Sequence, residues 1–346
     1  MKNILIYLTS FLILFFIVPA VCTITPQKEI EQETILNVDT NNLEQQSIEN
    51  SDNSTQKNQD EKYQIIKLLH TDTEITEELN IEEYLYGVVS SEMPANFEIE
   101  ALKAQAVVAR TYTIYQIIHN GNKHENADIC DDYACCQAWI NKEERLSKWS
   151  QEEADSNWNK ISEAVDSTKG KIIVYNSKPI NAFFHANSGG ITESSLNIWG
   201  GIDYPYLKSV ETSGEEGYTQ YNSEVVFSYE ELLQKIKVKY EDCEIDFSQG
   251  NCIEILEYTT SGRIKTIKFG NKDIAGTEAR TLLGLKSTNF TITNDGSKVK
   301  FTVIGYGHGV GMSQTGADAL AKAGSNYETI IKHFYTDVEI IEVKSL

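Results

Sequence analysis

The sequence predicts an α+β fold of mixed helices and antiparallel hairpins, preceded by a transmembrane anchor and a disordered linker. Residues 80–92 and 97–119 have the composition of two consecutive helices, and the second is apolar on nearly every side. Residues 171–185 and 290–305 each hold two β-prone runs around a short polar turn, which is typical of a hairpin. Because strands and helices do not alternate regularly, a doubly wound parallel sheet is not expected.

The first 24 residues have the properties of a membrane anchor. Residues 4–24 are uncharged and mostly apolar, long enough to span the ~30 Å hydrocarbon core as a helix. Lys2 precedes this segment and acidic residues follow it, so the N-terminus is expected in the cytoplasm and the body outside. We therefore expect a single-pass protein of the cytoplasmic membrane. The small residues at 18–20 leave a cleaved signal peptide as the alternative.

Residues 25–62 are predicted to be a disordered acidic linker, and residues 63–346 to be one folded domain. The linker contains nine acids and three lysines among many Gln, Asn, Ser and Thr residues. The whole chain has a formal net charge of −21. Without a basic patch or stripe, a nucleic-acid partner is not expected.

The helix at 80–92 ends on a candidate acid. Asn80 is the expected N-cap with Glu83 as its capping-box partner, and Pro94 disfavours helical geometry at Met93, so the helix should stop near Glu92. A carboxylate at that end faces the negative end of the helix dipole, beside apolar residues, and both effects favour its protonated form. Glu92 is thus a candidate proton donor, and a solvated helix-end Glu is the alternative.

The helix at 97–119 carries two cations on one face. Its apolar residues extend around nearly the whole circumference, which predicts a buried helix. Lys103 and Arg110 are seven residues apart and so share a face. Because a buried cation needs a polar or anionic partner, we expect Arg110 to pair with Glu92 or with an anionic ligand.

The other elements follow from caps, turns and apolar runs. Capping boxes predict helices that begin at Ser150, ending near 167, and after Ser228. The remaining predicted elements are strands at 62–70, 171–175, 179–185, 253–258, 263–269, 290–293, 299–305 and 338–343, an Ala-rich helix after 316 and a helix at 327–334.

Two glycine-rich segments are candidate ligand loops. Residues 305–316 do not fit a dinucleotide fingerprint, because Val310 stands where the third Gly is needed, and no Gly-Lys-Ser/Thr follows. That segment is expected to present His308, Ser313 and Gln314 to a polar ligand. The segment at 185–190 ends in paired glycines that let a backbone approach a ligand, although a simple turn is their commonest use.

A polar segment after the long helix contains potential metal ligands. His124, Cys130 and Cys136 are separated by five residues each, and imidazole and thiolate are the donors that Zn²⁺ prefers, so we predict a structural zinc site. A disulfide is the alternative in an exported protein. Cys135 either replaces Cys136 or stays a free thiol, and a water as fourth ligand would make the metal catalytic. A second candidate disulfide joins Cys243 and Cys252.

Four segments of the chain resemble one family. They are SEMPANFEIEALKAQAVVARTY at 91–112, HANSGG at 185–190, YPYLKSV at 204–210 and GYGHGVGMSQTGA at 305–317. Together they resemble, in order, the motifs of the stage II sporulation protein D family of peptidoglycan lytic transglycosylases, from roughly residue 63 to 340.

The resemblance implies a membrane-anchored enzyme whose catalytic body has a groove for peptidoglycan glycan strands. It would cleave between N-acetylmuramic acid and N-acetylglucosamine and leave 1,6-anhydro ends. It implies Glu92 as catalytic acid and base, with Arg110, Tyr206 and Lys208 in the groove. The remaining matched positions, with substrate-binding roles implied, are His185, Ser188, Gly189, His308, Ser313 and Gln314.

The resemblance further implies work in septal wall remodelling and engulfment during sporulation, beside an amidase and a membrane protein. Two other functions stay open at this point. One is a zinc-dependent peptidoglycan amidase or peptidase that acts through His124 and a metal-bound water. The other is a non-catalytic wall-binding protein that activates a partner amidase.

Overall fold

The computed structural model describes residues 63–119, 123–201 and 203–346, which belong to one compact unit. The predicted anchor and linker lie outside these residues. Within the described ranges, no helix has the length and apolar character needed to cross a membrane.

The described residues confirm the α+β class. They form five small sheets with strand orders β2-β1-β3, β10-β9-β8, β11-β12-β7, β13-β6 and β14-β4-β5. Pairing is antiparallel except between β1 and β3 and between β6 and β13. The strands are β1 Ile65–His70, β2 Ile75–Asn80, β3 Ile129–Cys130, β4 Lys171–Tyr175, β5 Lys178–Pro179, β6 Phe184–His185, β7 Asn222–Ser228, β8 Ile253–Tyr258, β9 Ile264–Phe269, β10 Lys272–Ala275, β11 Phe290–Asn294, β12 Lys298–Ile304, β13 Met312–Ser313 and β14 Glu339–Glu342.

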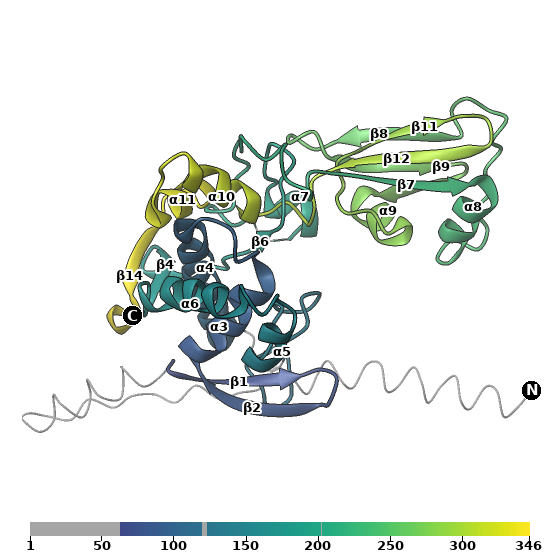
Figure 1. Cartoon of the computed structure of the whole chain (residues 1–346). Helices are drawn as coiled ribbons and strands as arrows, with labels where there is room; N and C mark the ends of the chain where they lie inside the picture. Colours follow the sequence, from purple (N-terminus) through teal and green to yellow (C-terminus); the bar gives the residue numbers. More distant parts are fainter. Residues whose placement is uncertain (1–62, 120–122, 202) are drawn as a thin grey trace, which may run out of the picture. The chain divides into compact units, whose positions relative to one another are not determined.

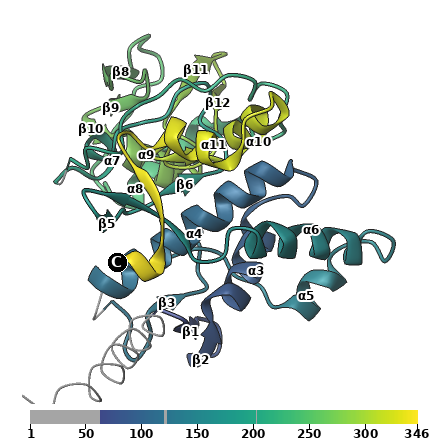
Figure 2. The ribbon, with the colours of Figure 1, turned by 90° about the vertical axis from the view of Figure 1, so that its left-hand side faces the viewer.

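The first hydrophobic core surrounds α4 (Ile99–His119), the long apolar helix. It packs against α3 (Ile81–Glu92), α6 (Ala154–Asp166), α10 (Gln314–Lys322), α11 (Tyr327–Phe334) and strand β4. Figure 2 shows α4 passing between the α3 and α6 side and the α10 and α11 side. Leu102, Val107 and Ala109 are fully buried, so the prediction of a helix buried on nearly all sides is confirmed. Two short helices, α5 (Lys142–Ser147) and α7 (Ser195–Trp199), and a 3₁₀ turn (Val343–Ser345) complete this part.

A second core lies between residues 222 and 304 (Figure 1). It is built by strands β7 to β12 with helices α8 (Tyr229–Lys237) and α9 (Gly276–Leu283), around buried side chains such as Ile267, Phe269 and Phe301. The predicted capping box is present, because Ser228 and Glu231 exchange hydrogen bonds at the start of α8. Strands β8, β9, β11 and β12 lie where the sequence predicted them, within about two residues.

Two local predictions need correction. The hairpin at 171–185 begins as expected, with Asn176 and Ser177 in the left-handed region, but β5 has only two residues before the chain leaves β4 and pairs with β13 instead. The helix expected from Ser150 begins at Ala154, and its N-cap, Glu153, makes no side-chain cap. Ser150 donates to the Glu153 carboxylate instead. The two residues of the expected capping box therefore bond to each other just before the helix begins.

Candidate active site and metal centre

Glu92 is the last residue of α3, as predicted. Met93 is extended (φ −121°, ψ 142°), because Pro94 excludes helical geometry at the residue before it. The Ala138 N–H donates a 2.6 Å hydrogen bond to Oε1 of Glu92, and the Gln314 side chain also hydrogen-bonds the carboxyl group. Burial nevertheless raises the pKa of Glu92 to about 7, and the two hydrogen bonds offset only part of that shift.

Gln314 connects two of the motifs that the sequence singled out. It is the first residue of α10 and donates from Nε2 to Oε1 of Gln105 on α4, at 3.4 Å. Since its side chain also contacts the Glu92 carboxyl, the glycine-rich segment at 305–317 does meet the acid of the 91–112 segment. The polar groups that Gln314 contacts are side chains of the protein, and its predicted contact with a polar ligand stays a prediction.

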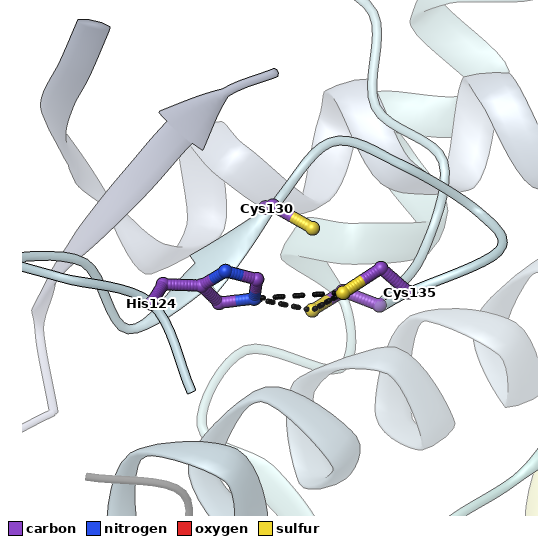
Figure 3. A group of neighbouring side chains, drawn as sticks. His124, Cys130 and Cys135 are labelled. Carbon is purple, nitrogen blue, oxygen red and sulfur yellow. Dashed lines mark hydrogen bonds between the residues drawn. The ribbon is translucent and has the colours of Figure 1, made fainter. Parts of the chain in front are cut away.

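His124 and three cysteines converge in the loop after α4. The ligand atoms of His124, Cys130, Cys135 and Cys136 all lie within 4.8 Å of one another, and Figure 3 shows three of these side chains turned toward one point. His124 Nε2 lies 3.3 Å from Cys136 Sγ and 3.7 Å from Cys135 Sγ, and the two sulfurs are 4.0 Å apart. Cys135 thus joins Cys136 in the cluster and does not replace it.

These four side chains fit a tetrahedral zinc ion. With Zn–S and Zn–N bonds near 2.3 and 2.0 Å, tetrahedral geometry separates two sulfurs by about 3.8 Å and a sulfur from a nitrogen by about 3.5 Å. The separations among His124, Cys135 and Cys136, 3.3 to 4.0 Å, are close to these values, all four ligand atoms lie within 4.8 Å of one another, and Cys₃His is a common structural zinc set. A fourth protein ligand is available, so a water is not needed to complete the shell. The cysteines of the described residues, Cys243 and Cys252 included, form no disulfide.

The same loop leads from the cluster to Glu92. Two residues after Cys136, Ala138 supplies the N–H that bonds Glu92. Between them, the buried Gln137 side chain donates to the Tyr84 hydroxyl on α3 (2.8 Å) and to Thr113 Oγ1 on α4 (2.9 Å). A metal in the cluster would therefore hold the segment that contacts the acid.

Arg110 has a different partner from the one expected. It makes a two-point contact with Glu82 of α3, with Nε–Oε1 and Nη2–Oε2 distances of 3.0 and 2.5 Å, and Nη1 donates to the Lys171 carbonyl. Its side chain is 1% exposed, and Lys103 pairs with Glu100 on the surface of α4. Of the two expected partners, Glu92 is wrong, because Glu82 at the other end of α3 pairs with Arg110. The substrate-binding role of Arg110 stays a prediction.

Ser188 and Ser313 are joined through a carboxylate that the sequence analysis missed. Glu215 is fully buried and accepts hydrogen bonds from both serine hydroxyls. Its other donors are the Ser188 and Gly190 N–H groups and the Thr212 and Thr315 hydroxyls. These bonds outweigh burial and lower the pKa of Glu215. Both serines are fully buried, so their hydroxyls do not face a groove, contrary to expectation.

Gly189 lies in the same turn and has to be glycine. Its φ is +72°, and a Cβ atom there would approach Ile304 Cγ2 to 2.8 Å. Its N–H donates to Asn187 Oδ1. The paired glycines therefore close a tight turn, which is the alternative that the sequence left open.

His185 and His308 lie side by side, with ring centroids 5.6 Å apart. His185 Nδ1 lies 3.1 Å from the Val310 carbonyl, and His308 Nδ1 accepts the Val310 N–H at 3.0 Å. Burial, with positive charge nearby, lowers the pKa of both rings, that of His185 to about 3. Both rings are therefore neutral near pH 7.

Tyr206 is buried and Lys208 is exposed. The Tyr206 side chain is 6% exposed, and its hydroxyl accepts the Asn181 N–H at 3.0 Å. The Tyr206 ring packs beside Tyr175 and Tyr204. Lys208 is exposed, as a residue that binds an anionic ligand must be. Their substrate-binding roles stay predictions.

The chain is similar to a protein family and to several known proteins. A family model described as Stage II sporulation protein matches residues 70–175. Stage II sporulation protein D of Bacillus amyloliquefaciens is 35% identical over 281 residues, covering 81% of this chain and 79% of that protein. The protein of that name from Bacillus subtilis (strain 168) is 36% identical over 80% of this chain and 79% of its own length. A Bacillus subtilis protein named amidase enhancer is 32% identical over 72% of this chain and 39% of its own length. The chain belongs to the stage II sporulation protein D family.

Proposed function

We propose that the chain is a peptidoglycan lytic transglycosylase that uses Glu92 as its acid and base. The observation that carries the proposal is a carboxyl group poised near neutral pH by burial at a helix C-terminus. Its pKa is shifted by burial, by Ala138 and by Gln314, and no second carboxylate is among these causes. Hydrolytic glycosidases generally need two carboxyl groups.

A lone acid suits a reaction in which the substrate supplies the nucleophile. Glu92 would donate its proton to the oxygen between N-acetylmuramic acid and N-acetylglucosamine, and the C1–O bond would break toward an oxocarbenium-like centre. The 6-hydroxyl of the muramic acid residue would then attack C1 and return its proton to Glu92. The Ala138 N–H and the Gln314 side chain would stabilise the carboxylate between these two steps.

We assign zinc a structural role. His124, Cys130, Cys135 and Cys136 would fill a tetrahedral shell, whereas catalytic zinc keeps one position open. This argues against a zinc amidase or peptidase. An amidase activator remains the second candidate, because one relative is named amidase enhancer.

We further propose that the N-terminal segment holds the body on the outer face of the cytoplasmic membrane. There it would act with an amidase and a membrane protein in engulfment.

The product of the reaction separates these proposals. Purified wall incubated with the protein should yield 1,6-anhydro-muramic ends by mass spectrometry. Glu92→Gln should lower that yield at least ~10²–10⁴-fold, because it removes the proton donor. Glu83→Gln is the matched control, since Glu83 is exposed on the same helix. Released stem peptides would instead indicate an amidase or peptidase, and no product at all would favour the activator.

A further inference from the structure

Trp199 is the most exposed of the four tryptophans, all of which lie in the described residues. It is the last residue of α7, and 50% of its surface is accessible. The other three tryptophans, Trp139, Trp149 and Trp158, are half-buried or buried. Single exposed apolar residues are ordinary on protein surfaces, so exposure alone assigns no role.

The ring of Trp199 is nevertheless held in place by two others. Its centroid lies 4.6 Å from that of Phe183 and 5.2 Å from that of His308. His308 is neutral and fixed, because Nδ1 accepts the Val310 N–H and the ring also hydrogen-bonds the Phe184 backbone. The neutral His308 ring is therefore a fixed neighbour of the indole and restricts its position through packing.

Glu193 ties the start of the short helix that carries Trp199 to the second core. Glu193, fully buried, accepts the Ser194 N–H at 2.7 Å and the Asn197 side-chain amide at 2.8 Å. Its other oxygen accepts the hydroxyls of Thr259 and Ser261, which lie between β8 and β9 of the second core. The position of the indole is thus set before any ligand arrives.

Aromatic side chains connect Trp199 to the acid. Phe183 lies 6.1 Å from Tyr112, and Tyr112 is close enough to Glu92 for that charge to act on its hydroxyl. From the other side, β6 pairs with β13, so Phe184 lies opposite Met312, two residues before Gln314. Phe183 thus lies beside both Trp199 and Tyr112, Tyr112 is within electrostatic range of Glu92, and Trp199 is the half-exposed member of this group.

We propose that Trp199 is a stacking platform for a sugar ring of the glycan strand on which Glu92 acts. The proposal rests on the proposed function, because it assigns a subsite for the same substrate. An indole face offers a large apolar surface to the C–H face of a sugar, while the sugar hydroxyl groups stay in water. A fixed indole loses little conformational entropy when the sugar binds.

Binding to an inactive enzyme tests this subsite separately from catalysis. The full chain carrying Glu92→Gln should bind oligomers of N-acetylglucosamine, with a change in tryptophan fluorescence. Adding Trp199→Ala should weaken that binding roughly 10-fold or more, as expected for a central aromatic contact. Adding Trp199→Phe should keep most of the affinity and abolish most of the fluorescence change. Tyr258→Ala is the control, because Tyr258 is 55% exposed on β8.

The outcomes separate the two proposals. Equal affinity with and without Trp199→Ala, in folded proteins with matching thermal melts, would overturn the subsite. So would no binding of the oligomers by the Glu92→Gln parent, or Trp199-dependent binding of stem peptides alone. Trp199-dependent sugar binding by a protein that releases no anhydro product would leave the subsite standing and overturn the proposed reaction.

Discussion

Glu92 and Glu215 are both carboxyl groups shielded from water, yet their surroundings drive them in opposite directions. Six hydrogen bonds from nearby N–H and hydroxyl groups lower the pKa of Glu215 and fix it as an anion. Among the described residues, Glu92 receives bonds only from Ala138 and Gln314, and burial raises its pKa to about 7. The number of donors, more than burial, decides whether a carboxylate is a structural anchor or a proton donor.

The two sites also depend on different supports. Glu215 ties together the turn at 187–190 and the start of α10, so its partners are part of the fold. Glu92 depends on the loop at 130–138, whose position is set by Gln137 and, in our proposal, by zinc. Each support can be removed separately.

Metal removal should have the largest effect. Chelation or His124→Ala should lower Tm by roughly 10 °C or more, because metal affinity is coupled to folding. The measurement is calorimetry together with elemental analysis, which should find one zinc per chain. Cys252→Ala, in the second half of the chain, should keep its zinc. Less than about a tenth of an equivalent of zinc, with Cys130 and Cys136 oxidised, would end the zinc assignment.

Substitution of Glu215 should come next in size. Glu215→Gln replaces an acceptor-only group with one that also donates, amid six donors, and should lower the free energy of unfolding by about 3–5 kcal/mol. Glu216→Gln changes an exposed neighbour and should stay within about 0.5 kcal/mol. Urea denaturation checks both variants. A Glu215→Gln protein as stable as its control would show that the network is not an anchor.

The pH dependence of stability should have opposite signs for the two acids, and the Glu92 contribution should amount to about 3–4 kcal/mol. A raised folded pKa means that the stability from protonated Glu92 is complete below the unfolded value, ~4.3, and is lost as pH rises to about 7. The lowered pKa of Glu215 gives stability that is present above ~4.3 and lost on acidification. Relative to wild type, Glu92→Gln should therefore gain stability between pH 4.5 and 7. Parallel curves would contradict the Glu92 pKa.

Local rules were enough to predict several elements. Pro94 stopped α3 at Glu92, and the Ser228 and Glu231 pair started α8, because a cap or a break acts within one turn. The His124, Cys130 and Cys136 spacing likewise predicted members of the His/Cys cluster that could hold a metal, since they lie close together in the sequence.

Long-range partners were beyond local rules. Arg110 pairs with Glu82, which is 28 residues away on another helix. Glu82 and Glu92 both belong to α3, and only the packing of α3 against α4 shows which of them meets Arg110. Glu215 lies in a Gly-Glu-Glu-Gly segment that reads as an exposed turn. The approach of segments near 188 and 313 gives it five of its six donors, and only Thr212 is local. Which of several acids meets a buried donor is decided by tertiary packing.

The most direct test of the account is a titration of the Glu92 carboxyl group itself. Carboxyl ¹³C NMR on glutamate-labelled protein, compared with Glu92→Gln to assign the resonance, would follow its ionisation. We expect a midpoint near pH 7, because burial disfavours the anion more than Ala138 and Gln314 stabilise it. A midpoint near 4.3, the value of a solvated glutamate, would contradict the assignment of Glu92 as the proton donor.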